Sequence, residues 1–189
     1  MIKRKWIIMS IVLLIITSFF CILQGYTFSY CSVKKETTRI VYYYHTNSGE
    51  ARYTSVTIEP DSLTWNYNEA RNDVKLKDMV RYDKKEYQEL INNLSQITFL
   101  ISGSADISVG GAGYSYYFYI GDDDYLSFDK TLITSGNCQK VVSMIKCFIA
   151  NHQTRCEQLF WKYSAEPHRR GQFGEFETLP DELENYRVK

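Results

Sequence analysis

Four cysteines follow the first 26 residues of this 189-residue chain, and a disulfide is the first chemistry that they suggest: Cys31, Cys138, Cys147 and Cys156. The last three are spaced nine residues apart. On one continuous helix, sulfurs with this spacing lie about 13 Å apart along the axis, whereas a disulfide needs Cα atoms within about 7 Å. A bridge would therefore join Cys31 to one of the three, and Cys147, which falls off the apolar stripe of its segment, is the most accessible candidate. We expect Cys138 and Cys156 to be buried thiols that pack as small apolar side chains.

No spacing typical of a metal or catalytic site accompanies these cysteines. The chain has no C-x-x-C or H-x-x-x-H pair for zinc, and no G-x-S-x-G or H-E-x-x-H motif. Its histidines, His45, His152 and His168, are far apart in sequence, and His152 is expected to be a core residue. We therefore predict no metal, no cofactor and no catalytic residue. An enzyme is the less favoured alternative, and it would need a cleft that brings His45 or His152 near a carboxylate or a cysteine.

Two loop motifs resemble ligand sites only superficially. Gly110-Gly111-Ala112-Gly113 leads into a strand, whereas phosphate-binding loops lead into a helix whose N-terminus faces the anion. Asp122, Asp123 and Asp124 lack the alternating spacing and the distal Glu of a calcium loop. The first motif ends a small, Gly-rich segment at 102–113 that is predicted to be a flexible loop, and the second motif predicts a solvated turn.

Tyrosine is the compositional outlier, with 16 copies, and its aromatic body with a polar tip is common at binding surfaces. The segment 114–120 places Tyr117 and Tyr119 on the strand face opposite to Tyr114, Tyr116, Phe118 and Ile120. Either both faces of this strand are covered, or its tyrosines form an exposed patch beside the glycine loop and the acidic turn. The second interpretation gives our predicted partner-binding residues: Tyr114, Tyr117, Tyr119, Asp122, Asp123 and Asp124.

The elements that would position these residues are strands and two helices. Strands are predicted at 39–46, 52–58, 62–68, 114–120 and 125–128, with a short one possible near 79–82 after a polar loop at 69–78. Segment 62–68 shows the clearest alternation, with Leu63, Trp65 and Tyr67 on one face. Asp83 and Glu86 have capping-box spacing and start a helix at 84–96.

A second, long helix is predicted from Asn137 through Phe160, because apolar residues recur along it at helical spacing. The predicted fold class is α+β: an antiparallel β-sheet with two helices packed on one face. An N-terminal transmembrane or signal helix would precede it.

That N-terminal segment fixes the expected location. Lys3, Arg4 and Lys5 precede the uncharged run 6–23, which as a helix would be about 27 Å long and would span a bilayer with its basic end in the cytoplasm. A cleaved signal peptide, giving a secreted or periplasmic protein, is one alternative, although no small-x-small cleavage site follows. Lipidation of Cys21 is another, disfavoured by the bulky Phe19 and Phe20 before it.

The predicted organisation is an anchor or signal at 1–26, a tether at 27–37, an extracytoplasmic α+β domain at 38–163 and a polar tail at 164–189. Beyond the first 30 residues the chain carries 19 basic and 22 acidic side chains, which argues against a nucleic-acid partner. We therefore expect a membrane-anchored binding domain that recognises a protein partner, as an inhibitor or immunity-type protein does. A domain that binds a small molecule or a glycan, in a pocket lined by Trp65, Tyr67 and Tyr116, is the alternative.

Overall fold

The central element is a six-stranded antiparallel sheet with strand order β5-β4-β3-β2-β7-β8. The computed structural model describes residues 2–23, 26–46, 52–70, 73–104, 114–121, 126–129, 136–165 and 179–188. The strands of the sheet are β2 (Ile40–Thr46), β3 (Arg52–Glu59), β4 (Ser62–Glu69), β5 (Val74–Arg81), β7 (Tyr114–Ile120) and β8 (Leu126–Asp129). A separate two-stranded sheet pairs β1 (Tyr26–Cys31) with β6 (Phe99–Ser104).

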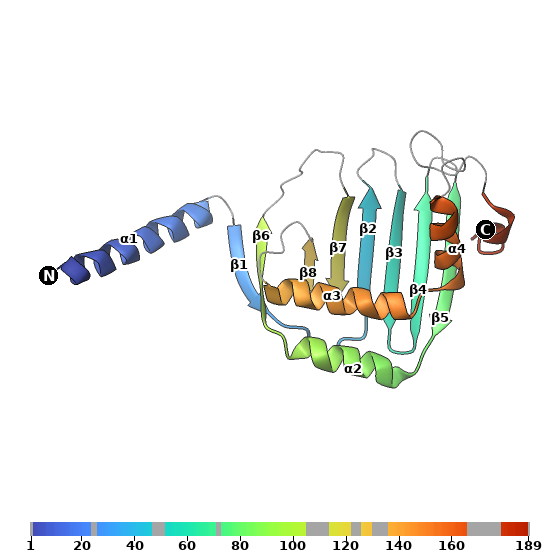
Figure 1. The fold of residues 1–189 in the computed structure, drawn as a ribbon, viewed down its shortest axis with the longest axis horizontal. Helices are drawn as coiled ribbons and strands as arrows, with labels where there is room; N and C mark the ends of the chain where they lie inside the picture. The colour runs from blue at the N-terminus through green and yellow to red at the C-terminus, as the bar shows by residue number, and fades with distance from the viewer. Residues whose placement is uncertain are drawn as a thin grey trace.

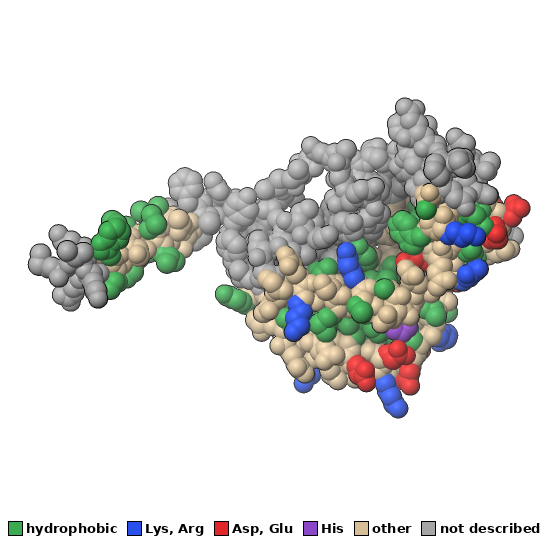
Figure 2. All heavy atoms as spheres, viewed as in Figure 1, with side chains coloured by type: hydrophobic (Ala, Val, Ile, Leu, Met, Phe, Trp, Pro, Cys, Tyr) green, Lys and Arg blue, Asp and Glu red, His purple; other side chains and the backbone are tan. Residues whose placement is uncertain are grey.

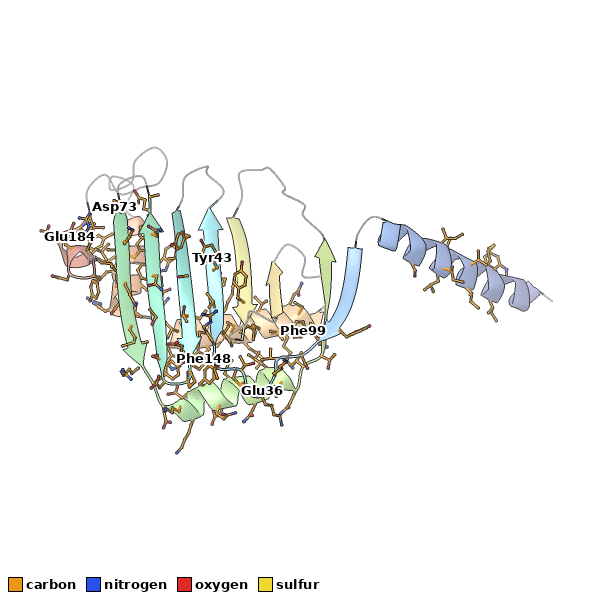
Figure 3. All side chains as sticks on the ribbon, turned by 180° about the vertical axis from the view of Figure 1, so that it is seen from behind. Glu36, Tyr43, Asp73, Phe99, Phe148 and Glu184 are labelled. Atoms are coloured by element: carbon orange, nitrogen blue, oxygen red, sulfur yellow. The ribbon has the colours of Figure 1, made fainter. Side chains whose placement is uncertain are left out.

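Helices cover one face of the large sheet, so the predicted α+β class is confirmed. Helix α3 (Gly136–Asn151) crosses this face, and α4 (Arg155–Ser164) lies in front of β4 and β5 (Figure 1). Helix α2 (Lys84–Ser95) runs along one end of the sheet. Seen from behind, the opposite face shows no helix of the described chain across its strands (Figure 3).

The core lies between the sheet and these helices. Alternation along β4 buries Leu63, Trp65 and Tyr67 on the helix side, as the sequence predicts. Buried partners from the neighbouring strands share this face: Ile40, Val56, Ile58, Leu76 and Ile120. The helices contribute the other half of the core: Leu90, Ile91, Leu94, Val141, Ile145, Ile149, Leu159 and Phe160. The predicted capping box of α2 is confirmed, with Asp83 accepting from Lys85 N–H at 3.0 Å and Glu86 accepting from Asp83 N–H at 3.3 Å.

The long helix predicted from Asn137 through Phe160 is wrong, because the chain forms two helices there. Helix α3 ends at Asn151, and Thr154 caps α4 with a side-chain oxygen that accepts from Glu157 N–H at 3.2 Å. The apolar spacing continues in phase across the break, which is why periodicity alone predicts one helix. The break turns α4 so that it packs over β4 and β5 instead of extending α3 (Figure 1).

Three further segments differ from the sequence prediction. Residues 74–78, predicted as loop, belong to β5, where Val74 and Leu76 are buried and Lys75 and Lys77 face solvent. Residues 27–31 of the predicted tether form most of strand β1. Its partner strand β6 includes residues 102–104, which belong to the segment predicted as a flexible loop. Backbone pairing of this kind needs no strong side-chain pattern.

The predicted polar tail also contains a packed segment. Helix α5 (Asp181–Glu184) buries Leu183 completely, and Val188 N–H donates to Lys75 O at 2.8 Å. Lys77 N–H donates to Tyr186 O at 3.0 Å, so this segment covers the edge of β5.

Helix α1 (Ile2–Leu23) projects from the domain, and Figure 2 shows apolar side chains along it. Within α1, the structure describes the side chains of residues 6, 7 and 9–18. Among the residues described, no helix is long and apolar enough to cross a membrane.

Candidate functional site

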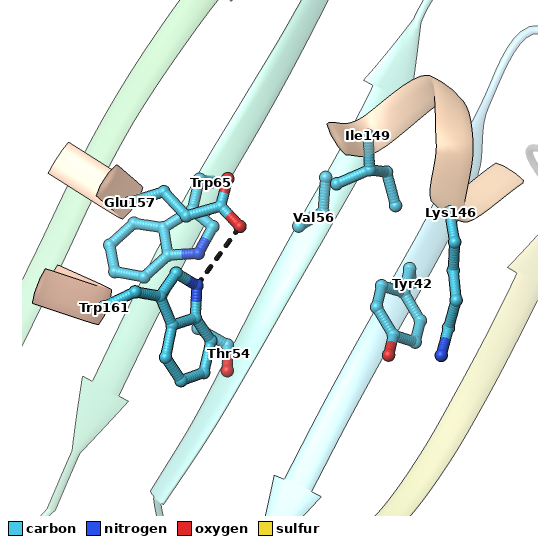
Figure 4. Close-up of a pocket in the computed structure, with 8 residues that line it drawn as sticks. All are labelled: Tyr42, Thr54, Val56, Trp65, Lys146, Ile149, Glu157 and Trp161. Carbon is cyan, nitrogen blue, oxygen red and sulfur yellow. Dashed lines mark hydrogen bonds between the residues drawn. The ribbon is translucent and has the colours of Figure 1, made fainter. Parts of the chain in front are cut away.

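A pocket of about 260 Å³ lies between the covered face of the sheet and helices α3 and α4 (Figure 4). Strands β2, β3 and β4 form its floor, and the two helices form its walls. Eight residues line it: Tyr42, Thr54, Val56, Trp65, Lys146, Ile149, Glu157 and Trp161. The lining is mainly apolar and aromatic, with one acidic and one basic side chain, which is typical of a small-molecule site.

Glu157 is the most unusual residue of this pocket. Glu157 is only 6% exposed, and its Oε1 accepts a hydrogen bond from Trp161 Nε1 at 3.4 Å. Within the described part of the chain, its buried Oε2 has no hydrogen-bond partner. Burial raises the pKa of the Glu157 carboxyl, and the hydrogen bond from Trp161 partly offsets this.

The N-terminus of α4 is held so that Glu157 faces the pocket. Thr154 caps the helix, and Asp78 Oδ2 on β5 accepts from Cys156 N–H at 2.9 Å. A Thr-x-x-Glu sequence usually forms a capping box, in which the Glu side chain returns to the cap backbone. Here one carboxylate oxygen instead accepts from Trp161, one helical turn further on, and the Glu157 side chain lines the cavity.

Packed aromatic rings make one wall rigid. The Trp65 ring lies 5.3 Å from the Phe160 ring, and the Tyr67 ring lies 4.6 Å from it, between centroids. Tyr67 is not among the residues that line the pocket, and its hydroxyl donates to the buried Glu69 Oε2 at 2.7 Å. Such rings fix the shape of the cavity beside Glu157.

The other side of the pocket carries its basic residue. Lys146 Nζ lies 5.6 Å from the centroid of the Tyr42 ring, within cation–π range. Figure 4 shows Lys146 and Glu157 on opposite sides of the labelled group, with Val56 and Thr54 between them. The arrangement provides an acidic end and a basic end separated by an apolar and hydroxyl-bearing floor.

This chemistry suits binding of an organic group. A buried carboxylate accepts hydrogen bonds from N–H or O–H donors, and aromatic faces pack on an apolar body. Within the described residues, no group of three or more His, Cys, Asp or Glu side chains is placed to hold a metal ion.

Of the predicted partner-binding tyrosines, Tyr119 has a described side chain, which lies on the open face of the sheet. In the register with β2, the backbone of Tyr119 pairs with Val41 and that of Tyr117 with Tyr43. Tyr119 is half-buried there, and the Tyr43 and Tyr53 rings stack with centroids 5.0 Å apart. Figure 3 shows Tyr43 on the helix-free side.

The backbone of Tyr114 pairs with Thr46. The predicted residues Asp122, Asp123 and Asp124 and the glycine loop 110–113 lie outside the described residues. The side chain of Tyr116 also lies outside the described residues. Of the three residues predicted to line a ligand pocket, Trp65, Tyr67 and Tyr116, the described lining contains Trp65.

The four described cysteines form no disulfide with one another, and Cys147 is exposed whereas Cys31 is half-buried. Cys31 Sγ donates to Phe99 O at 3.6 Å. Burial raises the pKa of Cys138 to about 11, and the nearby Cys31 adds to this shift. Cys31 is therefore close enough to Cys138 to affect its pKa, while the predicted pairing of Cys31 with Cys147 stays a prediction.

His152 joins two helices rather than lining the pocket. Its Nε2 lies 3.1 Å from Glu86 Oε2 on α2, and its Nδ1 lies 2.9 Å from Phe148 O on α3. The enzyme alternative required a cleft that brings a histidine near a carboxylate. His152 lies beside the Glu86 carboxylate, but neither residue lines the pocket of Figure 4.

Sequence reasoning missed both Glu157 and Trp161. The available signal was the Thr154-x-x-Glu157 spacing inside the predicted long helix, which marks a helix start. It would have placed Glu157 and Trp161 one turn apart in the first turns of a new helix.

Comparison with known proteins gives no relative from which a role could be transferred. No protein-family model matches the chain. No curated protein matches it, and no solved structure matches it.

Proposed function

We propose that this chain is a non-catalytic binding domain whose recognition site is the pocket between the sheet and helices α3 and α4. One observation carries the proposal: among the described residues, a buried carboxylate oxygen of Glu157 has no hydrogen-bond partner, and Glu157 is a residue that lines the cavity. A buried polar atom without a partner destabilises the fold, and ligand binding is a reason to retain it. The aromatic wall and the volume of about 260 Å³ fit a fragment-sized organic group.

A fragment screen followed by nuclear magnetic resonance tests this proposal. Trp65 and Trp161 both line the pocket, so their indole N–H signals report on its occupation. We expect small aromatic or aliphatic fragments to shift both signals, and the Val56→Trp variant, which fills the floor, to abolish these shifts. A folded chain whose two indole signals respond to no fragment would contradict the proposal.

We propose in addition that α1 attaches the domain to a membrane and that the domain lies on the extracytoplasmic side. The basic residues Lys3, Arg4 and Lys5 before the uncharged run support this orientation. The described apolar side chains of α1 support attachment, being between 47 and 68% exposed. Retention of the chain in the membrane pellet after carbonate extraction is the expected result, and release into the supernatant would contradict it.

A second candidate function is recognition of a protein partner by the open face of the sheet. The stacked pair Tyr43 and Tyr53 and the half-buried Tyr119 favour it. The double variant Tyr117→Ala with Tyr119→Ala should weaken capture of a native envelope partner and leave thermal stability nearly unchanged. Loss of the fold in this variant would show instead that the two rings belong to the core.

A further inference from the structure

The unpartnered oxygen of Glu157 restricts the chemistry of the group that enters the pocket. An ionised carboxylate only accepts hydrogen bonds, and Oε1 already accepts from Trp161 Nε1. The remaining oxygen, Oε2, is buried and lacks a described partner. A ligand must therefore present a hydrogen-bond donor at this point.

The surroundings favour a charged donor over a neutral one. A buried carboxylate is stabilised most by a positive charge at hydrogen-bond distance, since charge-assisted hydrogen bonds are about twice as strong as neutral ones. Trp65 and Trp161 line the same pocket, and aromatic rings attract a cation that lies over their faces. Lys146 at the opposite side repels a second positive charge, so one cationic group fits better than two.

The floor between these ends determines the rest of the ligand. Val56 and Ile149 offer apolar surface next to the hydroxyl of Thr54. We infer that the pocket binds a protonated primary amine on an apolar body, with Glu157 Oε2 as the acceptor of the ammonium group. This inference rests on the proposed function and specifies its ligand class.

An alkylammonium group has two sources, a free small amine or the lysine side chain of a peptide. Both present the same –NH₃⁺ group to Glu157, and both fit a pocket of about 260 Å³ in part or whole. They differ in what lies outside the cavity, so matched probes separate them.

Titration calorimetry and the two indole signals test the inference with four probes. These are 2-phenylethylamine, its neutral isostere 2-phenylethanol, the anion 3-phenylpropionate, and Nα-acetyl-lysine methylamide. We expect 2-phenylethylamine to bind more tightly than the alcohol, by roughly ten- to hundredfold, and the anion not to bind. Tighter binding of the lysine derivative than of 2-phenylethylamine assigns the source to a peptide, and the reverse assigns it to a free amine.

The Glu157→Gln variant is the decisive comparison, and Glu89→Gln, an exposed glutamate of α2, is its matched control. Glu157→Gln should remove the preference for the amine, and Glu89→Gln should keep it. If Glu157→Gln did not fold, the ratio of amine to alcohol affinity in the unmodified chain would decide alone.

The outcomes separate the inference from the proposed function. Equal binding of amine and alcohol, or amine binding that survives Glu157→Gln, overturns the ammonium assignment and leaves a ligand pocket. If no probe shifts the Trp65 and Trp161 signals, the pocket holds solvent only and both statements are overturned.

Discussion

Trp161 Nε1 donates a hydrogen bond of 3.4 Å to Glu157 Oε1, one helical turn earlier on α4. This contact holds one carboxylate oxygen, and the other is buried with no hydrogen-bond partner among the described residues. The indole ring of Trp161, which is 44% exposed, covers the outer side of the pocket. The two side chains thus form a unit in which the ring orients the acid.

The first prediction concerns Glu157→Gln and pH. Because burial raises the pKa of Glu157 above its ordinary value of 4.5, the folded state holds this proton at pH values where the unfolded state has lost it. Stability therefore falls as the pH rises from about 4.5 through the raised pKa, and the cost is larger at pH 7 than at pH 4. The glutamine variant lacks this titration, so we expect it to be more stable at pH 7 by about 1 kcal/mol.

Urea unfolding at pH 7 and at pH 4 checks this prediction. The gain in the free energy of unfolding should shrink toward zero at pH 4, where the glutamate is largely protonated in both states. A variant that is less stable than the parent at pH 7 would show that Glu157 has a stabilising partner after all.

The second prediction concerns the donor. Trp161→Phe keeps an aromatic ring but removes the N–H that partly offsets the raised pKa of Glu157. We expect the pKa of the Glu157 carboxyl to rise further, as measured from its ¹³C chemical shift during a pH titration. Trp65→Phe changes a pocket residue that has no described hydrogen bond to Glu157, and it should leave that pKa closer to the parent value. An unchanged pKa in Trp161→Phe would mean that the indole does not act on the carboxyl.

The third prediction concerns the hydrogen bond that attaches the N-terminus of α4 to β5. Asp78 Oδ2 accepts from Cys156 N–H at 2.9 Å and fixes the first turn of the helix to β5. Asp78→Ala should lower the free energy of unfolding by about 1–2 kcal/mol, in line with loss of a helix cap. It should also weaken binding of 2-phenylethylamine, because Glu157 is the next residue on that turn. Lys77→Ala, an exposed change on the same strand, is the control and should alter neither property.

The fourth prediction concerns the thiols. Cys31 contributes to the raised pKa of Cys138, and Asn137 beside it donates to Thr98 O at 2.8 Å, next to the Phe99 carbonyl that Cys31 contacts. On exposure to oxidised glutathione as the disulfide oxidant, we expect thiol exchange to join Cys31 to Cys138, with two glutathione thiols released per bond. Peptide mapping by mass spectrometry identifies the pair. A bond between Cys31 and Cys147 would support the sequence prediction instead.

Local patterns with strong physical causes were predictable. The alternation of Leu63, Trp65 and Tyr67 on β4 and the Asp83–Glu86 capping box of α2 both appear as expected. In each case neighbouring residues along the chain determine the structure, so the sequence alone suffices.

Strand β5 and the pocket could not be predicted in this way, because both depend on contacts between segments that are distant in the sequence. Strand β5 looks like a loop because its outward positions carry charges, and only pairing with β4 makes it a strand. The pocket could not be predicted, because Glu157 approaches Trp65 only after the chain breaks at Thr154 and α4 packs on the sheet. An unpartnered oxygen is a property of the folded surroundings and leaves no pattern in the sequence.

The most direct test of the ammonium site is a crystal structure of the chain with 2-phenylethylamine bound. The account predicts the amine nitrogen within roughly 2.7–3.2 Å of Glu157 Oε2, with the phenyl ring over Val56 and Ile149. A structure in which the amine is saturating but Oε2 contacts only water or protein would contradict the account.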